Sequence, residues 1–439
     1  MTDRYRSWGR FPCADQSVSP LHWRSDPIPR AAREPGPYLP FGNGRSYGDV
    51  CLNDQGHLLD CRGLSRLISF SRESGLIRAE GGVLFSELID VALPQGWFLP
   101  VTPGTQYVTL AGAIANDVHG KNHHRAGSLG SHIRSLELQR SDGSRLYCSE
   151  LENPEWFRAT IGGLGLTGVI TWAELQLMPV RGPFLQQETR CFASLPEFFS
   201  LAVESDQRFE YTFAWLDTLA VGASLGRGVL FRANHCDDER RVTRGRGALA
   251  VPFELPFSLI NRTSARLFNT AYYRLHQGRA QRLKRVHYEP FFYPLDRILN
   301  WNRVYGSRGF LQYQVVIPSS DAEAAVSELL GRTAAASSGS FLSVLKCFGH
   351  AKSPGMLSFP RPGVTLALDF PNRGAETLQL LDQLDEITRT ARGSLYPAKD
   401  ARMSAADFQR SYPQWREFAD FKDPNISSSF WRRVTRESV

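Results

Sequence analysis

The chain of 439 residues is 42% hydrophobic and 22% charged, with 37 Gly and 26 Pro, a composition typical of globular proteins that excludes a disordered, collagen-like or coiled-coil chain. Its 51 basic and 44 acidic residues give a net charge of +7, which fits an anionic substrate or a phosphate-bearing cofactor without requiring either. No apolar run approaches the ~20 residues of a membrane-spanning helix and no signal peptide is recognisable, so we expect a cytoplasmic protein.

Residues 1–180 predict an α+β domain of short elements separated by glycines. Residues 76–80 are typical of a strand, and the apolar spacing over 83–93 predicts a helix that ends at Pro94 and Gly96. Two predicted strands flank Asp142-Gly143, a pair that indicates a hairpin with a type I′ turn. A helix over 154–160, with Pro in its first turn, and a strand over 169–180 follow.

From Arg181 onward the elements become longer and glycines fewer. Strands are predicted over 310–318, 341–349 and 364–371, and helices over 321–332 and 375–391. We therefore expect a second α+β domain, an antiparallel sheet covered on one face by helices. The C-terminal segment 394–439 has the local chemistry of the first part, so the predicted domains are 1–180 completed by 394–439, and 181–393.

Two glycine clusters invite comparison with nucleotide-binding loops. Gly163, Gly165 and Gly168 have the G-x-G-x-x-G spacing, but a helix precedes them and a strand follows. That order is the reverse of the one that places a phosphate on a helix N-terminus, so we expect no Rossmann-type site there. The segment GNGRSYGD (42–49) forms either a tight turn or a loop whose backbone N–H groups converge on a pyrophosphate.

A third cluster, in and just after residues 102–130, combines small residues with polar ones, namely His119, Lys121, His123, His124 and His132. Small residues let a flat ring lie against the backbone, and the polar side chains supply donors. Alternatively, the imidazoles only cap neighbouring elements. His119 and His123 are four residues apart, but Gly120 lies between them and no carboxylate does, so we expect no metal site.

Together, GNGRSYGD, PGTQYVTLAGAIANDVHGKNHH (103–124) and GGLGLTG (162–168) resemble the PCMH-type flavin domain of the vanillyl-alcohol-oxidase superfamily. Within it, the chain is most similar to the decaprenylphosphoryl-ribose oxidases. The similarity extends to SWGR (7–10), FLQYQVVIP (310–318), VLKCFG (344–349) and SLYPAKDAR (394–402). The resemblance implies a two-domain α+β flavoprotein with an FAD-binding domain and an antiparallel-sheet substrate domain.

The resemblance also implies that FAD is bound without a covalent link. Related sugar-lactone and alditol oxidases attach their flavin to a histidine of the glycine segment, and Tyr47, which stands there in this chain, cannot form a histidyl bond. The residues that the resemblance assigns to FAD are Gly42, Asn43, Gly44, Arg45, Ser46, Tyr47, Gly48, Asp49, Gly104, Thr109, Ala111, Gly112, Asn116, His119, Ile170 and Tyr396.

The implied reaction oxidises a secondary hydroxyl of a lipid-linked phosphosugar, C2 of a polyprenyl-phosphoryl ribose in the relatives, to the keto sugar. A base takes the hydroxyl proton while the carbinol hydride passes to the flavin. The candidates for proton transfer are Lys399, His119 and Tyr47. The candidates for substrate binding are Lys121, Trp215, Gln312, Gln314, Lys346 and Lys399.

The residue pattern supports some of these roles and leaves plainer alternatives open. Gln312 and Gln314 alternate along a predicted strand, so they share one face, which either binds a sugar or faces solvent. Lys346 lies mid-strand among apolar neighbours, where a lone lysine is costly unless it has an anionic partner. Lys399 is otherwise an exposed lysine, and Trp215 is otherwise a core aromatic.

Residues 258–288 contain no acidic residue but seven basic ones, Arg262, Arg266, Arg274, Arg279, Arg282, Lys284 and Arg285. Apolar residues recur there at helical spacing: Ile260, Leu267, Phe268, Ala271, Tyr272 and Leu275. We expect a mobile basic lid over 255–290 that makes a peripheral contact with the inner membrane, where a prenyl phosphate is presented. The alternative is an amphipathic helix packed on the protein's own core. No nucleic-acid-binding module accompanies the charge, so we expect no nucleic-acid partner.

Two other functions stay open. One is a soluble sugar-lactone or alditol oxidase that uses O2, and the other is a non-catalytic flavoprotein that binds phospho-ligands. If the keto sugar is formed, we expect an NAD(P)H-dependent reductase as a partner, because reduction of the ketone completes the epimerisation of ribose to arabinose.

Overall fold

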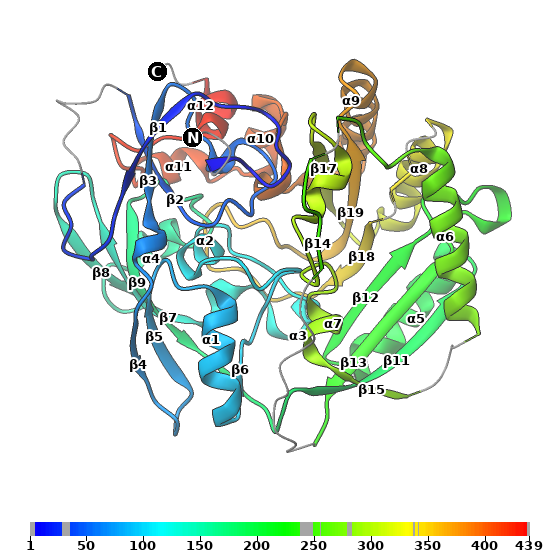
Figure 1. Ribbon diagram of the computed structural model, residues 1–439, viewed down its shortest axis with the longest axis horizontal. Coiled ribbons are helices and arrows are strands. Elements are labelled where there is room, and N and C mark those ends of the chain that lie inside the picture. Colours follow the sequence, from blue (N-terminus) through cyan, green and yellow to red (C-terminus); the bar gives the residue numbers. More distant parts are fainter. Residues whose placement is uncertain are drawn as a thin grey trace.

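The computed structural model describes residues 5–28, 36–237, 249–254, 256–278, 283–336, 339–340 and 342–436. Two α+β domains lie side by side, one built on a parallel and an antiparallel sheet and the other on a single large antiparallel sheet (Figure 1). Among the helices of these residues, none combines the length and the apolarity needed to cross a membrane.

Two sheets form the N-terminal domain. The smaller is a parallel sheet in the order β1-β3-β2, and the larger is an antiparallel sheet in the order β4-β5-β9-β7-β8. Their strands are β1 (Gln16–Pro20), β2 (Tyr38–Phe41), β3 (Gly56–Asp60), β4 (Leu67–Phe70), β5 (Leu76–Glu80), β7 (Ile133–Gln139), β8 (Arg145–Ser149) and β9 (Val169–Gln176). A separate pair joins β6 (Trp97–Phe98) to β10 (Met178–Pro179). The central position of β9 explains why its side chains are nearly all buried.

Four short helices belong to this domain: α1 (Phe85–Ala92), α2 (Leu110–Ala115), α3 (His123–Ala126) and α4 (Pro154–Thr160). α1 begins where the Glu87 carboxylate accepts the backbone N–H of Leu84 at 2.7 Å, and a single turn containing Pro94 ends it. α4 begins at Pro154, whose missing N–H costs nothing in a first turn. The helices and strands predicted for this part are confirmed.

The β7–β8 hairpin is present, but the predicted type I′ turn is wrong. Gly143 has a φ of +89°, whereas Asp142 is not among the residues with positive φ. Gly143 donates its N–H to the carbonyl of Arg140 at 3.0 Å, and Arg140 donates to that of Ser144 at 2.9 Å. The loop therefore has three residues, a type I turn followed by a left-handed glycine. The Asp142 carboxylate favours this turn because it accepts the N–H of Ser144 at 2.8 Å.

The large sheet has eight strands, all paired antiparallel. In spatial order they are β15 (Lys284–His287), β11 (Phe184–Phe192), β13 (Gly228–His235), β12 (Tyr211–Leu216), β18 (Ser343–Phe348), β19 (Gly363–Pro371), β17 (Phe310–Ile317) and β20 (Ser394–Leu395). One face packs on α5 (Leu195–Arg208), α8 (Ala322–Ala335) and α9 (Ala375–Thr390). These strands and helices confirm the predicted elements, except that residue 341 of one predicted strand lies outside the described residues.

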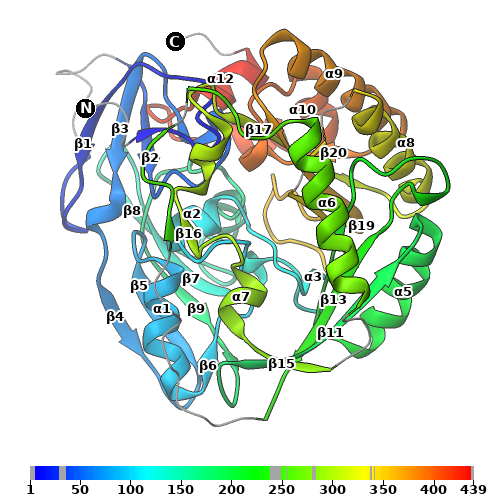
Figure 2. The same cartoon turned by 45° about the vertical axis from the view of Figure 1, so that its right-hand side comes forward.

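The prediction that helices cover only one face is wrong, because α6 (Arg262–Gln277) packs on the other face of the large sheet (Figure 2). α7 (Tyr288–Phe292) comes after α6 and β15 in the chain. Side chains of β12 alternate between the two faces: Ala214 packs with the α5 side, whereas Trp215 packs with the α6 side. A short parallel pair, β14 (Leu249–Ala250) with β16 (Ile298–Leu299), brackets α6 in the chain's course.

The C-terminal segment joins both domains. It starts as β20 at the edge of the large sheet and continues into α10 (Ala405–Ser411), α11 (Trp415–Ala419) and α12 (Ser429–Thr435). Tyr38 of β2 donates its backbone N–H to the carbonyl of Asn425 at 2.7 Å, which fixes these helices against the parallel sheet. α12 packs on a single helical turn, Asp49–Cys51, which begins at the last residue of the glycine segment 42–49.

Candidate active site

A cavity of about 560 Å³ lies between the two domains. The N-terminal domain contributes residues 42–47, 102–105, 108–121 in part and 164–170 in part. The large sheet, α6, α7 with the segment after it, and Tyr396, Ala398 and Lys399 complete the lining. A space of this size between two domains is typical of a site for a cofactor and a substrate.

Residues 42–47 form a loop along the cavity wall that is tied at both ends to distant segments. Trp8 donates its backbone N–H to the carbonyl of Ser46 at 2.7 Å, and Tyr47 donates to that of Ala398 at 2.9 Å. The Asn43 side chain donates to the carbonyl of Tyr107 at 2.7 Å. The loop is therefore held in place without help from a ligand.

Gly48 and Asp49, which the resemblance assigns to FAD, do not line the cavity. A Cβ on Gly48 would lie 1.6 Å from the carbonyl oxygen of Asp400, so only glycine allows this approach. The buried Asp49 carboxylate pairs with Arg433 of α12 at 2.7 Å. Both residues support the loop from behind.

The segment around α2 forms the wall beside this loop. Thr109 caps α2 by accepting the N–H of Gly112 at 3.2 Å. The Tyr396 hydroxyl donates to the carbonyl of Asn116 at 3.0 Å, and the buried Oδ1 of Asn116 has no partner within the described residues. The residues assigned to FAD that line the cavity are Gly42, Asn43, Gly44, Arg45, Ser46, Tyr47, Gly104, Thr109, Ala111, Gly112, Asn116, His119, Ile170 and Tyr396.

The glycine cluster at residues 162–168 contributes more to the cavity than its sequence predicted. α4 precedes it and β9 follows it, which confirms that it is not a Rossmann loop. Even so, Leu164, Gly165 and Gly168 line the cavity, because Leu164 donates its N–H to the carbonyl of Ala115 at the end of α2 at 2.7 Å. Only the pairing of distant segments reveals this contribution, so no local pattern could have predicted it.

His119 lines the cavity and is surrounded by the rings of Phe348, Phe359 and Tyr396. Burial lowers the pKa of His119 well below its usual value, and Lys346 lowers it further. The Gln314 amide donates to its Nε2 at 3.0 Å, which places the proton of the neutral ring on Nδ1. That buried Nδ1 has no partner in the part of the chain that the structure describes. Nor does that part hold three or more metal-ligating side chains grouped around one point.

Four cations line the cavity: Arg45, Lys121, Lys346 and Lys399. No carboxylate of the described residues forms an ion pair with any of them. Burial lowers the pKa of Lys346 to about 8, and it also lowers that of Lys399. Arg45 stays charged at neutral pH, and Lys346 is charged below about pH 8. Because buried charges without carboxylate partners are costly, these two groups favour an anion in the cavity.

Asp369 is a candidate that the sequence did not reveal. Its carboxylate accepts the Gln312 amide at 2.5 Å, and burial raises its pKa. Lys399 lies over the Tyr47 ring, 3.6 Å from its centroid, and the charge of Asp369 raises its pKa against the effect of burial. A lone carboxylate within the apolar strand 364–371 gives the same signal as Lys346, a charge that is costly to bury unless a function needs it.

The remaining predicted substrate residues also line the cavity. Gln312 and Gln314 both point into it from β17, as their spacing predicted. Lys121 binds the carbonyls of Phe291 and Phe292 at the end of α7, the latter at 3.2 Å, so part of its role is to hold α7. The ring of Trp215 packs on Tyr272 of α6, with centroids 4.7 Å apart.

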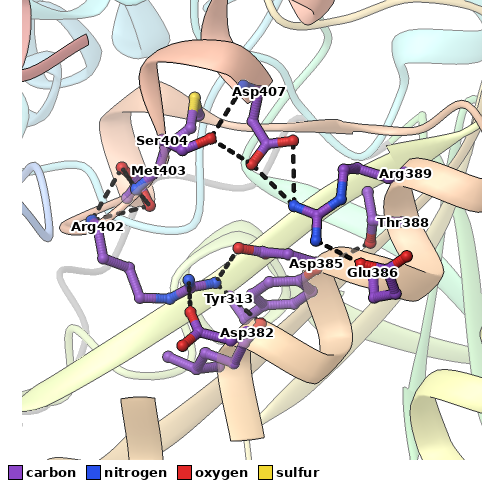
Figure 3. Close-up of polar contacts among 12 residues, drawn as sticks. Tyr313, Asp382, Asp385, Glu386, Thr388, Arg389, Arg402, Met403, Ser404 and Asp407 are labelled. Carbon is purple, nitrogen blue, oxygen red and sulfur yellow. Dashed lines mark hydrogen bonds and ion pairs between the residues drawn. The ribbon is translucent and has the colours of Figure 1, made fainter. Parts of the chain in front are cut away.

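A polar network behind the site positions the segment that carries Tyr396 and Lys399 (Figure 3). Arg402 pairs with Asp382 at 2.8 Å and with Asp385 at 2.6 Å, which ties the segment to α9. Arg389 of the same helix pairs with Asp407 at 3.1 Å. Because these ion pairs fix the chain on the C-terminal side of Lys399, the lysine is placed in the cavity and not on the open surface.

The basic segment forms α6, as its periodicity predicted, but the apolar side chains are divided. Ala265, Asn269 and Tyr273 are buried against the sheet, whereas Leu267 and Leu275 are 68% and 50% exposed. Phe268 and Tyr272 line the cavity. Arg279 and Arg282 lie outside the described residues, as do residues 255 and 279–282 of the predicted lid.

Comparison with known proteins agrees with this geometry. Residues 28–149 match the family model of an FAD binding domain. The chain is 33% identical to decaprenylphosphoryl-beta-D-ribose oxidase of Mycolicibacterium smegmatis, over 99% of this chain and 97% of that protein. It is also 30% identical to L-gulonolactone oxidase of Mus musculus, over 31% of each chain. With L-gulono-1,4-lactone dehydrogenase of Mycobacterium tuberculosis it shares 27% identity, over 43% of this chain and 42% of that one.

Proposed function

Because the chain belongs to the decaprenylphosphoryl-beta-D-ribose oxidase family, we propose that this FAD-dependent oxidoreductase oxidises the C2 hydroxyl of a polyprenyl-phosphoryl ribose to the ketone. One observation carries the proposal beyond similarity. Lys399 and Asp369 line the same cavity as the loops of the FAD-binding domain, and the Lys399 amine lies 3.6 Å from the centroid of the Tyr47 ring in one of those loops.

The lining residues fit FAD. Glycine backbone borders the cavity at Gly42, Gly44, Gly104 and Gly112, and a Cβ on Gly104 would meet no atom within 4 Å, so a ligand has room there. The buried atoms of Asn116 and His119 that lack partners within the described residues need hydrogen bonds, which a flavin ring offers. When bound, FAD supplies the acceptor for the carbinol hydride.

We propose that the cofactor is held without a covalent bond. The glycine segment 42–49 contains neither histidine nor cysteine, the residue types that attach to flavins. Heat or acid precipitation of the holoprotein is therefore expected to release all of the flavin into the supernatant. Flavin that stays in the washed pellet would contradict this proposal.

The proton of the sugar hydroxyl needs an acceptor in the same cavity. Burial favours the neutral forms of both Lys399 and Asp369, and each group opposes that effect on the other through its charge. Lys399 in its neutral form accepts a proton at Nζ, and Tyr47 beneath it orients the amine. His119 is a weaker candidate because its surroundings keep the ring neutral and its Nε2 already accepts a hydrogen bond.

The large sheet supplies the contacts with the sugar. Gln312 and Gln314 present amides on one face of β17, and the face of Trp215 closes the cavity on the α6 side. Lys346, which has no ion pair within the described residues, compensates negative charge on the flavin or the substrate. In this division of labour, residues 1–180 with 394–439 hold the cofactor and add Lys399 to the reaction, and residues 181–393 supply most of the contacts with the sugar.

A lipid-linked substrate also needs a route from the membrane. Ten of the seventeen large hydrophobic side chains that are exposed in the described residues fall between positions 249 and 299. We call this set the apolar rim: Leu249, Phe253, Phe257, Leu259, Leu267, Phe268, Leu275, Leu283, Ile298 and Leu299. α6, α7 and β16 of this stretch lie on the same side of the molecule (Figure 2), and Phe268 belongs to both rim and cavity. Arg262, Arg266 and Arg274 add positive charge on α6, as expected of a helix that docks on anionic lipid.

Liposome pelleting tests the apolar rim. The double variant Leu267→Ser/Leu275→Ser is expected to lower binding to anionic vesicles, because it removes apolar surface without burying polar groups. Leu151→Ser is the matched control, since Leu151 is 96% exposed but lies between β8 and α4 of the other domain. Equal pelleting of all three proteins would contradict peripheral membrane contact.

Substrate profiling under anaerobic conditions tests the activity. We expect a polyprenyl-phosphoribose to bleach the bound flavin and to yield a keto sugar, which an NAD(P)H-dependent reductase then converts to the arabino epimer. The flavin-domain similarity to L-gulonolactone oxidase makes a sugar lactone the necessary comparison. Bleaching by the lactone alone, followed by reoxidation with O2, would favour a lactone oxidase, and no bleaching by either would favour a protein that only binds ligands.

A further inference from the structure

Arg45 is an arginine that pairs with no carboxylate of the described residues. Its guanidinium lies 4.1 Å from the centroid of the Trp8 ring and 5.5 Å from that of Tyr107, and it borders the cavity. Its Nε is buried and has no hydrogen-bond acceptor among those residues. Asp296 acts on it electrostatically but forms no ion pair with it, and that carboxylate accepts the backbone N–H of Gln106 at 2.8 Å.

Other arginines of the same domain that stack on aromatic rings differ from Arg45, because they have carboxylate partners. Arg62, Arg66, Arg78 and Arg140 also lie over aromatic rings, and each is paired with a carboxylate at 2.6 to 3.4 Å. Arg45 makes the same stacking contact but lacks the carboxylate. Desolvation lowers the pKa of Arg45, although a guanidinium stays charged at neutral pH. Its fork of donors is therefore available to bind an anion.

The position of Arg45 indicates which anion it binds. On one side it acts electrostatically on Tyr47, whose ring lies under Lys399, where the sugar chemistry is proposed. On the other side Trp8 packs on Trp301, with centroids 5.6 Å apart, and Trp301 follows β16 of the apolar rim closely in the chain. Arg45 is therefore connected to both regions, through Tyr47 to the proposed sugar site and through Trp8 and Trp301 to the segment that follows β16 of the apolar rim.

A polyprenyl-phosphoryl sugar carries its phosphate between the sugar and the lipid. We propose that Arg45 binds the phosphate of the substrate through a two-pronged guanidinium contact, and that Trp8 and Tyr107 hold the guanidinium flat for it. This inference rests on the proposed function for its substrate class. It reassigns a residue that similarity would give to the pyrophosphate of FAD, which is the other phosphate source that Arg45 could serve.

Isothermal titration calorimetry of the holoprotein with farnesyl phosphate distinguishes the two phosphates that Arg45 could bind, that of the substrate and the pyrophosphate of FAD. This probe has the lipid and the phosphate but no sugar, so its binding does not depend on turnover. Arg45→Gln is expected to weaken its affinity by about 10- to 100-fold, the usual range for a lost charge-assisted hydrogen bond, with an unchanged ratio of FAD to protein. Arg45→Lys, which keeps the charge but not the fork, is expected to fall between wild type and Arg45→Gln. Arg66→Gln is the matched control, because Arg66 is stacked on Trp23 but lies outside the cavity.

The outcomes are distinct. Loss of FAD from Arg45→Gln with farnesyl phosphate affinity retained would assign Arg45 to the cofactor and overturn the inference. Equal affinities in wild type and Arg45→Gln, or no binding of farnesyl phosphate to wild type, would also overturn it. Binding that depends on Arg45 in a protein that never oxidises phosphoribose would leave the inference standing and refute the proposed reaction instead.

Discussion

At the scale of single residues, the site depends on buried ionisable groups that form no ion pair within the described residues. Lys399 is the sharpest test, because its amine lies over Tyr47 and shares the cavity with Asp369. Lys399→Met is expected to slow anaerobic flavin reduction by about 100- to 1,000-fold, within the range for loss of a general base, while FAD stays bound. Stopped-flow absorbance measures the effect, and Lys352→Met, at an exposed position, is the control. An unchanged reduction rate would remove Lys399 from the chemistry.

Lys346 predicts a pH dependence. Burial lowers the pKa of its amine to about 8, so the cation is lost at a lower pH than for a lysine in water. Affinity for an anionic substrate is therefore expected to be full below pH 8 and to fall as the pH rises through about 8. His119, Lys121 and Lys399 share the cavity and feel the charge of Lys346, so the experiment compares wild type with Lys346→Met. The variant is expected to bind weakly with a flatter profile; a fall of the same size in both proteins would assign the titration to another group.

At the scale of elements, the C-terminal segment holds the 42–47 loop in place. Arg433 of α12 pairs with Asp49 at 2.7 Å and with Asp400 at 2.9 Å, and both carboxylates are buried. Arg433→Gln leaves two buried carboxylates close together, so we expect a loss of about 3 kcal/mol in the free energy of unfolding. Urea denaturation measures it. Arg410→Gln is the control, because Arg410 makes a more exposed pair with Asp407 and is expected to cost less than about 1 kcal/mol. Equal losses of unfolding free energy in the two variants would show that the ion pairs of Arg433 do not stabilise this part of the fold more than an exposed pair does.

The close approach of Gly48 to Asp400 gives a second test at this scale. Gly48→Ala places a Cβ 1.6 Å from the Asp400 carbonyl oxygen, so the 42–47 loop and the segment that carries Lys399 must separate. We expect a protein that purifies with much less FAD and has a lower melting temperature. In contrast, a Cβ on Gly331 of α8 would meet no atom within 4 Å, so Gly331→Ala is expected to stabilise the protein slightly. Full FAD content in Gly48→Ala would contradict the packing described here.

Periodicity and turn chemistry predicted most elements, because these depend on neighbours in the sequence. Helices such as α4 and α9 and strands such as β17 lie where their patterns placed them. The hairpin was predicted but its turn type was wrong, because the Asp142 carboxylate accepts the backbone N–H of Ser144 and favours a longer loop. In the site, residues given by motifs were found in the cavity wall apart from Gly48 and Asp49. Asp369 was missed although a lone carboxylate in an apolar strand is a local signal. The glycine cluster 162–168 was missed because only the pairing of distant segments brings it to the cavity.

At the scale of the whole molecule, two domains enclose one cavity and the C-terminal segment joins them. The N-terminal domain lines the cavity with backbone and small residues, and the large sheet lines it with two glutamine amides, the Asp369 carboxylate and Lys346. The apolar rim borders the same cavity through Phe268. This arrangement suits the proposed substrate, which has a sugar at one end and a lipid at the other.

The most direct measurement is a single-turnover reduction of the holoprotein by polyprenyl-phosphoribose deuterated at C2, compared with the unlabelled compound, without oxygen. If the C2 hydroxyl is oxidised in this cavity, the flavin bleaches with both compounds, more slowly with the deuterated one, and the 2-keto sugar is recovered. Absence of bleaching, or equal rates with slowing only when another carbon is deuterated, would contradict the account.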